Sequence, residues 1–183
     1  MNYLKKCGTF IIVLLIVFWS ARIWSINQVS DDTHNYEMNQ VIDCGDITIC
    51  ANESFLLTQE EFEKQFELPK GIVDYSEEAR IVGICLVIKN VSDNAIEWDD
   101  VIRFIEGGFE SRTWASSITP LYGQCINKFY TSNLESGACQ EIWFITRVSK
   151  MCFKDSTWKN IDCENFYYVL SLSPYKVEIR LTT

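Results

Sequence analysis

The chain has 183 residues, of which 48% are hydrophobic, and a net charge of −9 at neutral pH. All 25 acidic residues lie beyond Ser30, so the long C-terminal part of the chain carries the negative charge. A surface of that sign repels nucleic acid and anionic lipid, and no cluster of Lys or Arg relieves the repulsion, so we expect no nucleic-acid binding.

The first 26 residues have the pattern of a membrane-targeting segment. Lys5 and Lys6 precede an apolar run over residues 10–19, as the charged and hydrophobic regions of a signal sequence do. A helix of this length can also span a bilayer. Cleavage after Ser25 would place Ile23 in a peptidase pocket that prefers small side chains. We therefore expect residues 1–26 to stay as a single-pass transmembrane helix in the cell membrane, with the rest of the chain extracytoplasmic. The alternative is a cleaved signal and a secreted protein.

The rest of the chain divides into a linker and one domain. Residues 27–40 are polar and without pattern, which predicts a stalk, and residues 41–183 have the length of a single domain. A strand pair is expected over residues 41–51. Thr58 and Glu61 then have the spacing of a capping box, which predicts the start of one short helix that ends before Pro69.

Most of the remaining segments have the pattern of short strands. The segment Ile81–Ile88 is apolar on both faces, which predicts a buried central strand. Lys176–Leu181 alternates strictly, which predicts one face on a core and one in water. Further strands are expected at residues 95–98, 101–105, 109–115, 122–125, 128–131, 139–148 and 166–172. This spacing predicts an all-β fold, a β-sandwich of about seven to eight strands.

Seven cysteines follow the N-terminal segment, an odd number that leaves at least one thiol without a partner in the chain. Cys85 lies in the apolar run and is expected to be buried. An extracytoplasmic location favours disulfides, so the other six are candidates for bridges between sequence neighbours. The nearest pairs are Cys44 with Cys50, Cys125 with Cys139, and Cys152 with Cys163. Six cysteines allow 15 connectivities, so the pairing stays open.

No pattern of catalytic residues is present. The chain has no Gly-x-Ser-x-Gly elbow, no phosphate-binding loop and no histidine inside the expected domain, because His34 lies in the stalk. Adjacent carboxylates such as Asp99 and Asp100 do not give the separation across a cleft that glycosidases need, and they supply too few oxygens for calcium. No Cys-x-x-Cys pair suggests a metal site. We therefore expect no enzyme, no cofactor and no metal.

Aromatic residues beside carboxylates leave one class of ligand open. Trp98 with Asp99 and Asp100, and Trp114 with Arg112, could stack on a sugar ring while the polar groups bind its hydroxyls. The competing interpretation is that both tryptophans fill the core of the sandwich. A shared open face would favour carbohydrate binding. Burial of both would favour contact with another protein through loops or an edge strand.

Several segments carry a resemblance to a known group of domains. Lys89–Asp93, directly after an apolar strand, resembles the Asn-x-Ser hairpin of small extracytoplasmic immunoglobulin-like domains. Leu134–Gly137 is similar to a turn of these domains, although it lacks their proline, and Tyr168–Leu181 resembles their closing hairpin. The predicted helix at Thr58–Phe66 is also like theirs. Such domains occur in uncharacterised membrane-anchored proteins and lipoproteins of Gram-positive bacteria. The resemblance covers Val41–Thr183 and implies an immunoglobulin-like β-sandwich without catalytic residues.

These observations favour a binding role. Sandwiches present loops and sheet edges to partners, and their function depends on those sites and not on the fold. We therefore predict a non-enzymatic, membrane-anchored protein that binds another envelope or secreted protein. The alternative is a cell-surface carbohydrate-binding module.

Overall fold

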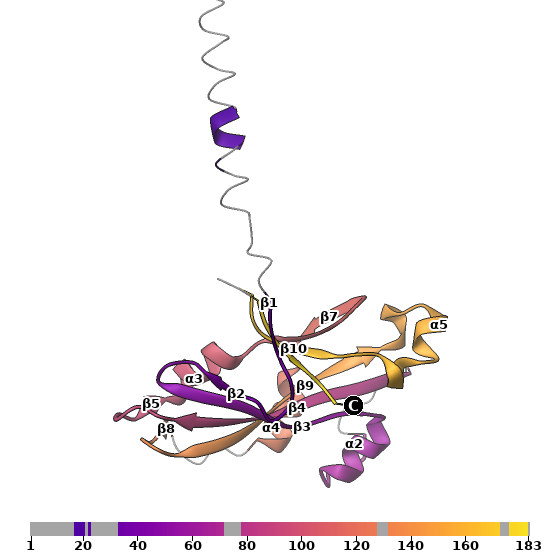
Figure 1. Ribbon diagram of the computed structural model, residues 1–183. Coiled ribbons are helices and arrows are strands. Elements are labelled where there is room, and N and C mark those ends of the chain that lie inside the picture. The colour runs from indigo at the N-terminus through magenta and orange to yellow at the C-terminus, as the bar shows by residue number, and fades with distance from the viewer. Residues whose placement is uncertain are drawn as a thin grey trace, which may run out of the picture.

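The computed structural model describes residues 17–20, 22, 33–71, 78–127, 132–172 and 176–182. Within these residues the chain forms eleven strands and a few short helices, and nine of the strands belong to two sheets (Figure 1). One sheet has the order β2-β3-β4-β9, and the other has the order β1-β11-β10-β6-β7. A hydrophobic core that draws on both sheets lies between them. The chain is therefore a mostly β protein with two packed layers, in agreement with the predicted sandwich.

The four-stranded sheet contains the longest strands. They are β2 (Val41–Asp43), β3 (Ile47–Leu57), β4 (Ala79–Asn90) and β9 (Cys139–Ser149), and all of their pairings are antiparallel. The central position of β4 confirms the buried strand predicted at residues 81–88. The strand pair predicted over residues 41–51 is confirmed as the β2–β3 hairpin. Its turn contains Gly45 with a φ of 84°, a left-handed conformation that glycine adopts without steric cost.

The five-stranded sheet contains shorter strands and closes the chain. They are β1 (Thr33–Tyr36), β6 (Gly108–Ser111), β7 (Trp114–Ser117), β10 (Tyr167–Ser171) and β11 (Lys176–Arg180). Strand β1 pairs in parallel with β11, whereas the other neighbours are antiparallel. Among the described residues, the first strand of the sandwich is therefore β1, which lies inside the segment predicted to be a stalk. On β11 the predicted alternation holds for the buried Val177 and Ile179, but Glu178 on the opposite face is also buried.

One hydrophobic core joins the layers. Tyr168 of β10 stacks on Phe144 of β9 with ring centroids 5.5 Å apart, and its ring meets the edge of Phe109 of β6 at 5.2 Å. Side chains of alternate residues point into this core, as the two-residue period of a strand requires. Its fully buried members include Ile49, Val82, Ile84, Leu86, Ile88, Ile105, Val148 and Phe166. Burial of one such side chain stabilises the fold by about 2 kcal/mol.

A second apolar cluster lies on the outer face of the four-stranded sheet. Phe55, Ile81 and Ile145 from the strands pack with Phe62 and Tyr122 from two helices, α2 and α4. Because these helices cover the outer face, strand β4 is enclosed on both sides. That enclosure explains why its sequence is apolar almost throughout.

The helices differ from the sequence expectation in number. They are α2 (Gln59–Gln65), α3 (Trp98–Ile105), α4 (Pro120–Ile126) and α5 (Asp155–Trp158), with 3-10 turns at Lys150–Cys152 and Ile161–Cys163. The remaining strands, β5 (Ile96–Glu97) and β8 (Asn133–Leu134), form a separate pair. Helix α2 confirms the predicted capping box. The strands predicted at residues 101–105 and 122–125 are wrong, because these residues belong to α3 and α4. The strand predicted at 128–131 lies outside the described residues.

The predicted transmembrane helix needs correction. Of residues 1–26, only Val17–Ser20 and Arg22 are described, and they are helical. Throughout the described part of the chain, no helix combines the length and the apolar character that crossing a membrane requires. The prediction of a single-pass anchor, and of a membrane location built on it, is therefore not supported.

Candidate functional site

The residues predicted to bind a sugar do not form a common surface. Trp98 is only 7% exposed and belongs to the main core, at the start of α3. Trp114 on β7 is half-buried, and its ring packs against Phe166 at 5.9 Å and against a second phenylalanine. Asp99 and Asp100 are exposed in the first turn of α3, where they suit the positive end of the helix dipole. The structure therefore uses both tryptophans for packing and does not bring the four residues together as an open platform.

The predicted disulfides are wrong. Among the described residues the free thiols are those of Cys44, Cys50, Cys85, Cys125, Cys139, Cys152 and Cys163. In the β2–β3 hairpin, Cys50 lies opposite Val41, whereas Cys44 lies at the turn, so the two are out of register. Helix α4, which carries Cys125, is tied at its end to Trp143. Trp143 lies about 13 Å along β9 from Cys139, and a disulfide needs Cα atoms within about 7 Å. Cys85 is buried, as predicted.

A hollow of about 540 Å³ opens where the two sheets part, between β1, β2 and the end of α3. We call it the inter-sheet hollow. Its apolar lining includes Tyr36, Ile42, Phe104 and Leu170, and its polar lining includes His34, Asp43, Arg103 and Glu106. The hollow therefore combines apolar side chains with several polar and charged groups, and a concave site of this size is large enough to bind a ligand group.

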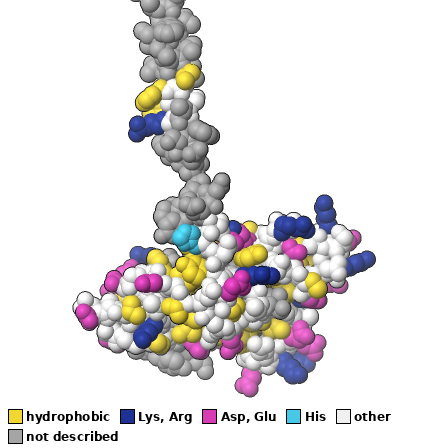
Figure 2. All heavy atoms as spheres, in the orientation of Figure 1, with side chains coloured by type: hydrophobic (Ala, Val, Ile, Leu, Met, Phe, Trp, Pro, Cys, Tyr) yellow, Lys and Arg dark blue, Asp and Glu magenta, His cyan; other side chains and the backbone are white. Residues whose placement is uncertain are grey.

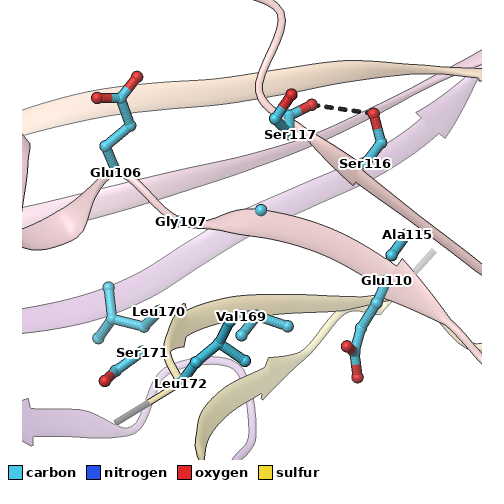
Figure 3. A pocket seen from close by; sticks show the side chains of 11 residues that line it. Glu106, Gly107, Glu110, Ala115, Ser116, Ser117, Val169, Leu170, Ser171 and Leu172 are labelled. Atoms are coloured by element: carbon cyan, nitrogen blue, oxygen red, sulfur yellow. Dashed lines mark hydrogen bonds between the residues drawn. The ribbon is translucent and has the colours of Figure 1, made fainter.

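A second hollow, of about 560 Å³, lies on the outer face of the five-stranded sheet (Figure 3). We call it the outer hollow. Its floor is formed by small residues and by β10, because two glycines lie close to neighbouring backbones. A Cβ at Gly107 would lie 1.9 Å from the carbonyl oxygen of Val169 on β10, and a Cβ at Gly108 would lie 2.9 Å from the carbonyl oxygen of Ser116 on β7. Leu172 borders it and is 68% exposed. The closeness of the two backbones explains the glycines without reference to a ligand.

The two hollows meet at one place, because Glu106, Leu170 and Ser171 line both. The pairing of β10 with β11 is irregular here: Val169 pairs with Glu178, but Ser171 pairs with Val177, so Leu170 is an inserted residue. Such a bulge bends a strand and redirects its side chains, and bulges are common beside functional sites. We call the meeting point of the two hollows the junction.

The junction is bordered by apolar side chains at the surface. Phe104 on α3 lies in the inter-sheet hollow and is 52% exposed, and Leu172 follows the bulge. Figure 2 shows hydrophobic side chains reaching the surface of this part of the domain, beside the histidine. Exposed apolar groups around a hollow are typical of a contact site for a partner.

Most charges near the outer hollow are already neutralised. Lys176 of β11 forms ion pairs with Glu110 and with Glu178, the second at 2.6 Å. Burial lowers the pKa of Lys176, but the hydrogen bonds to the two carboxylates outweigh this and raise it overall. Lys176 therefore stays protonated at neutral pH and holds the two glutamates in place.

The chemistry of the inter-sheet hollow does not point to catalysis. Cys44 and His34 both line it, a combination that suggests a nucleophile with its base. Burial, together with the nearby Asp43, raises the pKa of the Cys44 thiol. A nucleophilic cysteine needs the opposite shift, toward the thiolate. No group of metal-ligating side chains comes together in the part of the chain that the structure describes.

Sequence reasoning missed this site for two reasons. His34 and Tyr36 lie on β1, which reads as an unpatterned polar segment in the sequence. The sequence pattern around Phe104 predicts a strand, in which consecutive side chains point to opposite faces of the sheet, whereas Phe104 lies on a helix. The spacing of Trp98, Val101 and Ile105, all buried, is helical and was the available signal.

Two solved structures resemble the chain in outline. One is a conserved hypothetical protein from Bacillus anthracis, with 12% identity and a TM-score of 0.49. The match spans 78% of this chain and 94% of that protein's chain. The other is an uncharacterized beta-sandwich protein from Clostridium difficile 630, with 12% identity and a TM-score of 0.47. The match spans 84% of this chain and 98% of that protein's chain. No family model and no curated protein matches the sequence.

Proposed function

We propose that the chain is a non-enzymatic binding protein that recognises another protein at the junction of the two hollows. The observation that carries this proposal is the exposure of Phe104 and Leu172 beside hollows of more than 500 Å³. Aromatic and aliphatic groups at the centre of a contact provide most of the binding energy in protein interfaces. The immunoglobulin-like subtype of the sandwich stays a prediction.

The alternative of carbohydrate binding loses the feature on which it depended. It required Trp98 and Trp114 to share an open face, but Trp98 is buried and Trp114 packs on core aromatics. An aromatic ring must be exposed to stack on a sugar. Contact with a protein through loops and a sheet edge is the interpretation favoured by the burial of Trp98 and by the lack of a shared open face.

The test compares the full chain with two surface variants. Phe104→Asp places a charge in the inter-sheet hollow, whereas Met151→Asp makes a similar change at a residue that is 76% exposed and lines neither hollow. Chemical cross-linking in the source cells, followed by capture and mass spectrometry, then identifies partners. We expect one recurring partner with the unmodified chain and with Met151→Asp, and its loss with Phe104→Asp. Equal recovery of the partner with both variants, or capture of the chain without any recurring partner, would overturn the proposal.

A further inference from the structure

We infer that the junction binds an extended peptide segment of the partner in which a Lys or Arg stands next to aliphatic residues. This inference rests on the proposed function, because it names the part of the partner that the same site recognises. The basic side chain pairs with Glu106, and the aliphatic side chains occupy the hollows beside Phe104 and Leu172. Three properties of the junction lead to this assignment.

The first property is that the backbone on both sides of Glu106 is held in a fixed position. The buried phenol of Tyr168 donates a hydrogen bond to the carbonyl oxygen of Ile105 at 2.7 Å and accepts one from the backbone N–H of Gly107 at 3.0 Å. Both residues that flank Glu106 are therefore tied to one rigid side chain of the core. Because this backbone is already fixed, less conformational entropy is lost when the Glu106 carboxylate binds a partner. Such preorganisation increases affinity.

The second property is that the Glu106 carboxylate is not paired, unlike the carboxylates near it. The neighbouring Glu110 is paired with Lys176. The Asp43 carboxylate accepts a hydrogen bond from the backbone of Gly45. Within the described residues, the exposed Glu106 carboxylate has no ion pair or hydrogen bond, although it lines both hollows. A basic group placed there gains a charge-assisted hydrogen bond without breaking one that exists.

The third property is the arrangement of apolar surface around that charge. The hollows lie on two sides of the Leu170 bulge and share its lining, and Phe104 and Leu172 are exposed on either side. In Figure 3, Glu106 and Glu110 lie at opposite ends of the stretch that crosses the outer hollow, with Val169 on the neighbouring strand β10 and Leu172 directly after it. A ligand that reaches both hollows and the carboxylate must be elongated, with apolar groups next to a cation. A peptide segment in extended conformation has this form.

The experiment selects ligands from a displayed library of short random peptides on the full chain. Parallel selections use Glu106→Gln, Glu106→Lys and a control, Glu60→Gln, in which a carboxylate is removed from the exposed first turn of α2. We expect peptides with Lys or Arg beside Leu, Ile or Val from the unmodified chain and from the control. Their affinity for Glu106→Gln should be about fivefold to tenfold lower, because the glutamine keeps a neutral hydrogen bond but loses the charge that makes the native one stronger. Glu106→Lys should select acidic residues in place of the basic ones.

The outcomes separate this inference from the proposed function. Peptides without a preference for basic residues, bound equally by Glu106→Gln, would overturn the inference but leave a protein-binding site at Phe104. Peptides whose binding depends on Glu106 but is unaffected by Phe104→Asp would overturn the apolar half of the inference. If no peptide is enriched and the cross-linking experiment also recovers the bait alone, both proposals fail. Circular dichroism of each variant establishes that the fold is retained before the affinities are compared.

Discussion

At the scale of single residues, the phenol of Tyr168 has the most consequences. It is fully buried, and burial raises the pKa of this hydroxyl so far that it stays protonated and able to donate. Tyr168→Phe would keep the ring contacts but leave the Ile105 carbonyl and the Gly107 N–H without their partner. We expect a loss of about 2 kcal/mol in the free energy of unfolding, measured in urea. The half-buried Tyr167 provides the control, and a Tyr168→Phe effect no larger than that of Tyr167→Phe would contradict the argument.

A second residue, Asn90, explains the Asn-x-Ser pattern seen in the sequence. Its buried side chain donates to the carbonyl oxygens of Asn94 and Leu134 and accepts from the backbone and hydroxyl of Ser92. These bonds tie the turn after β4 to strand β8. We expect Asn90→Ala to lower the free energy of unfolding by about 3 kcal/mol, because several buried polar groups lose partners at once. Asn94→Ala is the matched control, since Asn94 contributes only backbone atoms, and similar losses in the two variants would refute this explanation.

At the scale of elements, α2 shows a capping box that depends on pH. The Thr58 hydroxyl accepts from the backbone of Glu61, while the Glu61 carboxylate accepts from the backbone of Thr58 at 2.9 Å. This backbone bond, with help from the Thr58 hydroxyl, lowers the pKa of Glu61. A lowered pKa in the folded state means that the stabilisation is present above the ordinary carboxyl pKa and is lost as the pH falls through the folded value.

The corresponding test follows thermal unfolding across the acid range. We expect Glu61→Gln to lower the melting temperature at pH 7, and the difference from the unmodified chain to shrink as the pH falls through the lowered pKa of Glu61 and its carboxylate becomes protonated. Thr58→Ala should cost about 1 kcal/mol at neutral pH, the usual effect of losing a helix cap. Glu60→Gln should leave the melting temperature nearly unchanged. A constant difference between Glu61→Gln and the unmodified chain at every pH would contradict the capping role.

The elements that sequence reasoning predicted are those with a local signal. Helix α2 has its capping box, and β4 and β9 are long apolar runs between turns. Helix α4 was mistaken for a strand, although Pro120 at its first position is a common helix start. Strand β1 was missed because it has no local signal: its residues are mostly exposed, and it becomes a strand only by pairing with β11 at the far end of the chain.

At the scale of the whole molecule, the site depends on contacts that no local pattern contains. The inter-sheet hollow exists because β1 and β2, close in sequence, join different sheets and leave a gap that α3 borders. The junction similarly needs the bulge of β10 against β11. Strand patterns could therefore predict a sandwich but not this site. The buried Glu178 illustrates the same limit, because the strand pattern placed it in water, whereas its pairing with Lys176 allows burial.

The state of the thiols tests the whole fold in one experiment. Burial raises the pKa of Cys85 to about 12, and Glu141 and Glu53 add to the effect, so this thiol stays protonated and unreactive at pH 8. We expect native alkylation without reductant to label the exposed Cys125, Cys139, Cys152 and Cys163 rapidly and Cys85 only after denaturation, as mass spectrometry of peptides would show. If any of the exposed cysteines resists alkylation and becomes labelled only after a reductant is added, it forms a disulfide, which would contradict the structure. Rapid native labelling of Cys85 would instead mean that the outer face of the four-stranded sheet opens readily, because a thiol enclosed there reacts only when its cover moves.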